Sequence, residues 1–230
     1  MPPPQARTIS EPANYRFLEG LPPRDREYVL SSAGSRKFSA NSVITTQGDP
    51  ADRLYLLVKG CVRLFYNTDD GRKILLIWLA HGDAFGAYSL LAKPSTYLVS
   101  SEAIRDSEVL FWDRATFRGY VEKFPQLVAN AFATAAEYVE WYMNAHVALT
   151  CYTARERLAS VLIGLSRAIG ERVHDGIEID VTNEDLANSA NITPYTASRL
   201  MSEWQKSHAI VKRRGKVLLR SAERLLLKTV

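Results

Sequence analysis

The chain has 230 residues but only two cysteines, Cys61 and Cys151, which stand ninety positions apart. Neither a disulfide framework nor a zinc-binding knuckle has such a spacing. An iron–sulfur site normally uses four cysteines, so an iron–sulfur cluster is excluded as well. We therefore expect reduced thiols and, by default, a cytoplasmic protein.

Long apolar segments are also missing. The longest run, Ile74 to Ala80, is far shorter than the roughly 20 residues that cross a bilayer. The proline-rich start MPPPQAR lacks the apolar core of a secretory signal. The sequence thus predicts a soluble protein without a membrane segment, and its hydrophobic content of 47% is enough to bury a core.

Motifs of catalysis are absent too. The chain has no glycine-rich phosphate loop and no nucleophile with a base at a recognisable spacing. Its four histidines, His81, His146, His174 and His208, do not cluster as metal ligands. We predict a binding protein rather than an enzyme, with no metal and no cofactor.

Charge is unevenly distributed. Residues 1–150 hold 16 basic and 16 acidic residues, whereas residues 151–230 hold 13 and 9, so the net charge of +4 comes from the last third. The segment 205–220 contains six basic residues and no acid: Lys206, Lys212, Arg213, Arg214, Lys216 and Arg220. Such a cluster is either a solvated face or a surface for a polyanion, and nucleic acid is the polyanion we favour.

Residues 36–112 have the pattern of an antiparallel β-domain. Short β-branched and aromatic runs are separated by Gly48, Gly60, Gly71 and Gly82, at spacings of 12, 11 and 11 residues. Asp70-Gly71 is the best hairpin signal. We therefore predict turns at these glycines in a roll or sandwich.

Asp113 is the predicted cap of a helix that ends at Pro125, and a long helix is predicted from Pro125 to about Leu149. Val128, Ala135, Tyr142 and Leu149 recur every seven residues, and Ala131, Tyr138 and Ala145 lie between them. This apolar seam indicates either a core helix or pairing with a second copy. The residues from Leu149 to Thr153 then form the expected hinge to a further helix, 153–169.

The last fifty residues carry local signals of a helix-turn-helix. Thr182 and Asp185 resemble a capping box that opens a helix at 183–190, and Asn191 suits a tight turn. Thr193 and Pro194 then begin a second helix that extends to about residue 207. Four of its apolar residues have the helical spacing expected for burial: Ala197, Leu200, Met201 and Trp204. Residues 209–213 and 216–220 predict a two-stranded wing with a basic tip, followed by a short helix after Ser221.

Four segments resemble the cAMP receptor protein and fumarate–nitrate regulator family of bacterial transcription factors: LYLLVKGCVRL, the stretch from Gly82 to Gly86, RERLASVLIGL and TPYTASRLM. The resemblance covers about residues 15–228. It implies an α+β fold with an N-terminal antiparallel β-roll like a cyclic-nucleotide-binding domain (residues 15–124), a dimerisation helix (125–150) and a C-terminal winged helix-turn-helix (151–230). The resemblance also implies a homodimer that binds double-stranded DNA, at a near-palindrome whose half-sites lie about 34 Å apart. RNA polymerase would be a further partner if the protein is an activator.

The resemblance also places the DNA contacts. Arg199 is expected to form the bidentate pair with guanine, and Tyr195, where the family usually has Glu, to pack on a thymine methyl. Pro194 replaces an Arg of the cAMP branch, so we expect an operator unlike the common one. The predicted contacts are Thr193, Pro194, Tyr195, Thr196, Ser198, Arg199, Ser202, Lys206 and, for phosphates, Arg213, Arg214 and Lys216.

The cAMP clamp of the family is missing. Its Glu and its Arg-Ser pair correspond to Ala87, Tyr97 and Leu98, so the fixed positive charge for the phosphate is lost. We predict instead an apolar or aromatic effector, unless the same side chains fill the space. The predicted lining is Gly86, Ala87, Tyr88, Tyr97, Leu98, Tyr138, Trp141 and Tyr142.

Three alternatives to an apolar effector stay open. Haem sensors of the family place their ligands at the positions of Gly86 and Tyr88, where only a tyrosine could bind ferric haem, and His146 is another candidate ligand. Cys151 could act as a thiol switch, whereas Cys61 is expected to be an inert core residue. An effector-independent regulator fits the same residues.

Overall fold

The computed structural model describes residues 15–71, 73–87 and 95–226. The chain divides into two compact units, and the boundary between them falls after Trp141, inside a long helix. Within the described residues, no helix is long and apolar enough to cross a membrane.

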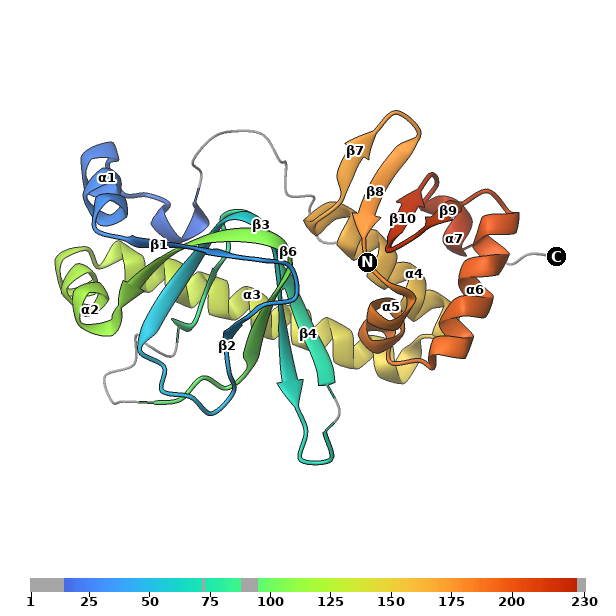
Figure 1. Cartoon of the computed structure of the whole chain (residues 1–230), viewed down its shortest axis with the longest axis horizontal. Helices are drawn as coiled ribbons and strands as arrows, with labels where there is room; N and C mark the ends of the chain where they lie inside the picture. Colours follow the sequence, from blue (N-terminus) through green and yellow to red (C-terminus); the bar gives the residue numbers. More distant parts are fainter. Residues whose placement is uncertain (1–14, 72, 88–94, 227–230) are drawn as a thin grey trace. The chain divides into compact units, whose positions relative to one another are not determined.

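The N-terminal unit is built on a six-stranded antiparallel sheet (Figure 1). Its central strands follow the order β1-β6-β3-β4, while β2 pairs with β6 and β5 with β3. This arrangement confirms the predicted antiparallel β-fold. The strands are β1 (Gly34–Phe38), β2 (Val43–Thr45), β3 (Arg53–Asn67), β4 (Lys73–Leu79), β5 (Ala84–Phe85) and β6 (Ser100–Asp113).

The predicted turn at Gly60 is wrong, because β3 runs straight through this position. Gly60 has a φ of 100°, and a Cβ there would lie 2.2 Å from Oγ of Ser107 on β6. The glycine thus permits a close approach of two long strands at a shift in their register. The hairpin at Gly71 is confirmed, since Asn67 pairs with Lys73 and Gly71 has a φ of 81°.

Helices pack against this sheet around Trp112, which is fully buried with Phe117 and Leu127. Asp113 is the predicted cap of α2: its carboxylate accepts a hydrogen bond from the Thr116 amide at 2.9 Å, which lowers the pKa of the aspartate. The helical elements of this unit are η1 (Arg16–Leu18), α1 (Pro23–Ser31), α2 (Arg114–Lys123) and the first part of α3 (Gln126–Cys151).

The long helix α3 confirms the predicted helix, but the predicted seam is divided between two environments. Ala131 packs against the Trp112 core, and Tyr138 is half-buried against the roll, with its hydroxyl 3.5 Å from the Ala84 carbonyl. These two positions therefore face the protein's own roll.

A different face of α3 is apolar and exposed. Phe132 is 78% exposed and Val139 is 57% exposed, while Val128 and Ala135 are exposed beside them at helical spacing. We call these four residues the apolar strip of α3. The seven-residue pattern included Val128 and Ala135 but missed Phe132 and Val139.

The C-terminal unit combines helices with a four-stranded antiparallel sheet of order β7-β8-β10-β9. In Figure 1, α4 and α5 lie below the strands and α6 runs down their right-hand side. The predicted two-stranded wing is therefore half of a larger sheet, and strand β7 was missed because all its residues are exposed. The elements are α4 (Ala154–Ala168), β7 (Glu171–Val173), β8 (Gly176–Asp180), α5 (Asn183–Ala190), α6 (Pro194–Lys206), β9 (Ile210–Arg213), β10 (Lys216–Leu219) and α7 (Glu223–Leu226).

Local sequence signals set the helix boundaries of this unit. Thr182 and Asp185 form the predicted capping box, and Asn191 adopts a φ of 48° at the turn. The four apolar residues of α6, Ala197, Leu200, Met201 and Trp204, are buried as predicted. A helix-turn-helix of α5 and α6 is thereby confirmed.

The linker between the long helix and α4 is shorter than predicted. Because α3 continues to Cys151 and Thr153 already caps α4, only Tyr152 and Thr153 lie between the two helices. Cys151 is exposed at the end of α3, whereas Cys61 is buried in β3 as expected, and neither forms a disulfide.

Candidate functional site

The start of α6 projects two side chains that suit base contacts. Thr193 caps the helix by accepting from the Thr196 amide at 3.1 Å, and Pro194 follows at the first helical position. Tyr195 is 79% exposed and Arg199 stands one turn further along the same face. The buried apolar side of α6 thus fixes the orientation of its exposed side.

Three predicted contacts of α6, Thr196 among them, are less accessible than expected. Ser198 and Ser202 are half-buried, and the hydroxyl of Ser202 donates to the Ser198 carbonyl at 2.8 Å. The same hydroxyl accepts from Nζ of Lys212 on β9 at 3.2 Å. The wing is thereby joined to the middle of α6, and Lys206 is exposed at the end of the helix.

Arg199 is engaged by a carboxylate of its own helix. Its Nη1 lies 2.5 Å from Oε1 of Glu203, and Oε2 of Glu203 lies 2.8 Å from Nη1 of Arg155 on α4. Glu203 was not among the predicted site residues, although its spacing of four residues from Arg199 is a recognisable signal for an ion pair.

Two of the basic residues of the wing, Arg213 and Lys216, pair with acids of β8. Glu178 accepts from Arg213 at 2.8 Å and from Lys216 at 2.6 Å, and Asp180 lies 3.4 Å from Lys216. The hydrogen bond with Lys216 lowers the pKa of Glu178, and the same bond raises the pKa of Lys216.

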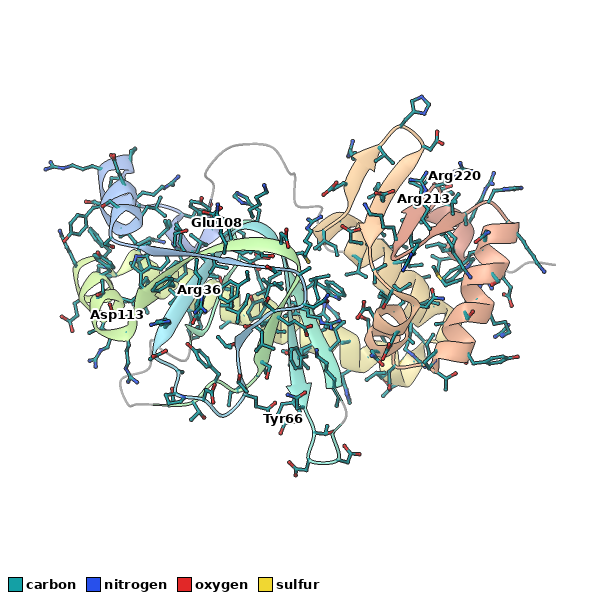
Figure 2. All side chains as sticks on the ribbon, viewed as in Figure 1. Arg36, Tyr66, Glu108, Asp113, Arg213 and Arg220 are labelled. Atoms are coloured by element: carbon teal, nitrogen blue, oxygen red, sulfur yellow. The ribbon has the colours of Figure 1, made fainter. Side chains whose placement is uncertain are left out.

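These pairs alter the predicted phosphate surface of the wing. Arg213 lies on β9 of the C-terminal sheet, and Arg220 lies just beyond β10 (Figure 2). Arg220 is 3.4 Å from Asp175 of the β7–β8 turn. Arg214 is exposed at the wing tip and, among the described residues, has no acidic partner. Residues 205–220 contain no acid, but acids of a neighbouring strand lie beside them in the structure. Lys216, for example, pairs directly with Asp180 across the sheet.

In the β-roll of the N-terminal unit, Tyr97 is a core residue and does not form an exposed lining of an effector site. It is buried, its hydroxyl donates to the Arg53 carbonyl at 2.9 Å, and it accepts from the Arg53 amide at 3.2 Å. Burial raises the pKa of this phenol. Gly86 lies against it, since a Cβ at Gly86 would be 3.4 Å from the Tyr97 ring and 2.7 Å from the Arg53 carbonyl.

The other predicted effector residues are spread over different surroundings. Tyr138 packs against the core cluster that contains Tyr97, whereas Ala87 and Leu98 are exposed. Trp141 and Tyr142 are exposed on α3, on either side of the unit boundary. Tyr88 lies outside the described residues. The structure thus brings together Gly86, Tyr97 and Tyr138 from this set.

No metal centre is assembled by the described part of the chain. Within it, no group of three or more His, Cys, Asp or Glu side chains could hold a metal ion. His146 is exposed on α3.

Two family models match the sequence. Residues 35–124 match the cyclic nucleotide-binding domain, and residues 156–227 match the Crp-like helix-turn-helix domain. The two matches correspond to the sheet of the N-terminal unit and to most of the C-terminal unit.

Curated proteins resemble the chain over most of its length. The anaerobic regulatory protein of Bacillus subtilis is 27% identical over 210 residues, which are 86% of this chain and 85% of that protein. The cAMP-activated global transcriptional regulator CRP of Pasteurella multocida is 23% identical over 84% of this chain and 92% of its own length. Among solved structures, FixK2 from Bradyrhizobium japonicum has the same fold, with a TM-score of 0.72, 23% identity, and coverage of 84% of this chain and 95% of that one.

Proposed function

Because the chain belongs to the CRP/FNR family, whose members are transcription regulators with a helix-turn-helix DNA-binding domain, we propose that it binds a near-palindromic operator as a homodimer. The proposal is a binding function in gene regulation and not catalysis. The observation that carries it is α6, which buries its apolar face and exposes Tyr195 and Arg199.

Three exposed residues of α6 and one of the wing have defined roles in this proposal. Arg199 forms a bidentate pair with guanine, and Tyr195 packs on a thymine methyl in the major groove. Arg214 and Lys206 contact phosphates, which add affinity but carry no sequence information. Because Tyr195 lacks the carboxylate that accepts from cytosine, the preferred half-site differs from the one common in the family.

The apolar strip of α3 supports the homodimer. Contiguous exposed apolar residues on a soluble protein mark an interaction surface, and a second copy of α3 offers the same surface in return. Pairing along this helix would give the dimer two recognition helices for two half-sites about one turn of DNA, roughly 34 Å, apart.

A selection from random duplex DNA tests the proposal. The full chain is expected to enrich a near-palindrome with a guanine in each half-site, and native mass spectrometry is expected to find two chains per duplex. Recovery of the common family palindrome would contradict the role of Tyr195. A monomer without preference for any duplex at moderate salt would contradict the proposal as a whole.

We further propose that the N-terminal roll responds to a small apolar or aromatic molecule. Supporting this, the position of the phosphate-binding arginine is held by Tyr97, which is buried and bonded to the backbone of Arg53. An effector would shift the population between two pairings of α3, with Tyr152 and Thr153 absorbing the change.

Native mass spectrometry of protein purified from its host tests the effector. A bound organic molecule supports the proposal, haem absorbance supports the alternative of a haem-dependent gas or redox sensor, and operator binding by ligand-free protein supports an effector-independent regulator. Loss of the co-purified molecule is expected to change operator affinity if the effector is regulatory.

A further inference from the structure

Glu203 on α6 connects the residue that reads a base to the framework of the C-terminal unit. One of its oxygens lies 2.5 Å from Nη1 of Arg199, and the other lies 2.8 Å from Nη1 of Arg155. Arg199 is one turn away on the same helix, whereas Arg155 belongs to α4. A single carboxylate therefore links a surface arginine to an interior one.

The interior end of this link is fixed. The Arg155 side chain is only 19% exposed, and its guanidinium lies 5.5 Å from the ring centre of Trp204, which is fully buried. The first turn of α4 is itself held by the capping box of Thr153 and Glu156. Arg155 is thus a partly buried donor that packs on Trp204, and its hydrogen bond orients the carboxylate of Glu203.

The outer end is the more exposed one. The Arg199 side chain is 54% exposed, and an unrestrained arginine of this kind populates many rotamers. A carboxylate on Nη1 limits these rotamers and leaves the edge formed by Nε and Nη2 available, which can donate to N7 and O6 of guanine. Charge-assisted hydrogen bonds of this type also add geometric specificity.

We propose that Glu203, anchored by Arg155, is a positioning residue that directs the Arg199 guanidinium at one guanine of each half-site. This inference rests on the proposed DNA-binding function and adds a specificity-determining residue that touches no base. It predicts that neutralising Glu203 weakens the choice of base at one operator position and leaves the choice at the other positions unchanged.

The test measures binding of the full chain to its selected operator and to operators with each base pair replaced in turn. Arg199→Ala defines the position that Arg199 reads, where a bidentate pair discriminates by about 5- to 150-fold. Glu203→Gln, which keeps the shape of the side chain, is expected to lower discrimination there by about 5-fold or more. Arg155→Met is expected to act at the same position from another helix, whereas Glu223→Gln on α7 removes an equal charge and is expected to have no effect.

A double-mutant cycle separates positioning from general support of the fold. In the Arg199→Ala background, Glu203→Gln is expected to change the base preference no further, because its partner is gone. Unchanged discrimination in Glu203→Gln, or equal weakening at every position, would overturn the assignment. Sharper discrimination would overturn it too, since Glu203 would then sequester Arg199. If the unmodified chain prefers no duplex, the proposed function itself fails, and this inference fails with it.

Discussion

The two helices with proposed binding roles, α3 and α6, differ in where their apolar side chains lie. In α6, Ala197, Leu200, Met201 and Trp204 are all buried, so its packing is complete within one chain. In α3, Leu127 alone is fully buried among 26 residues, and the apolar strip is exposed. The comparison teaches that exposure of apolar side chains, more than helix length, distinguishes α3, the helix that we propose pairs with a second copy.

The largest expected effect comes from placing a charge in the apolar strip. Phe132→Glu puts a carboxylate at the most exposed apolar position of α3, where two copies would face each other across a dimer axis. We expect a folded monomer by light scattering. Operator affinity should fall by at least about 100-fold, because one half-site then binds alone.

Ala133→Glu is the matched control, since Ala133 is exposed on α3 but lies outside the strip. It should leave the dimer intact. A dimeric Phe132→Glu protein with unchanged operator affinity would show that α3 is not the interface.

A large effect on stability is expected in the packed helix. Trp204→Ala removes a fully buried indole that donates to the Leu225 carbonyl at 3.0 Å. The free energy of unfolding should fall by about 3–5 kcal/mol, measured by urea denaturation of the full chain. Trp204→Phe should cost less, and a loss below about 1 kcal/mol for the alanine variant would contradict the packing described for α6.

A smaller effect tests the charges beside α6. Glu178→Gln removes the acid that pairs with Arg213 and Lys216, so affinity for non-specific DNA should rise several-fold and the salt slope should steepen by about 1–2. Because Lys216 lowers the pKa of Glu178, the carboxylate stays charged at pH values below the usual pKa of a glutamate. Its neutralisation of Arg213 and Lys216 is lost only as pH falls through the lowered pKa. Glu184→Gln, at an exposed position of α5, is the charge-matched control.

The smallest effect concerns the beginning of α6. Thr193→Ala removes the side-chain cap of the Thr196 amide and should destabilise the unit by about 1 kcal/mol, measured without DNA. Thr193→Ser keeps the hydroxyl and should restore the stability. An equal loss in both variants would show that the cap contributes nothing.

Features that depend on a few neighbouring residues were predicted well from the sequence. The capping box of Thr182 and Asp185, the positive φ of Asn191 and the buried side of α6 all follow from local spacing. The same holds for the cap at Asp113. Each is determined within one or two helical turns, so no knowledge of distant strands is needed.

Features that depend on strand register, or on which side of a helix faces the protein core, could not be predicted. Gly60 has the sequence signature of a turn, yet its role is to let β3 approach Ser107. Glu178 and Lys216 are 38 positions apart and meet only through the pairing of β8 with β10. The seven-residue pattern in α3 likewise could not show which apolar residues face the roll, such as Tyr138, and which face outward, such as Phe132.

The two cysteine thiols differ in solvent exposure, and this difference can be used to measure how two copies of the chain are arranged. A maleimide dye would react at Cys151, at the end of α3, while Cys61 inside β3 is shielded. Energy transfer between differently labelled copies would then report the distance separating the ends of paired helices, and its change upon mixing with an operator, without any engineered attachment point.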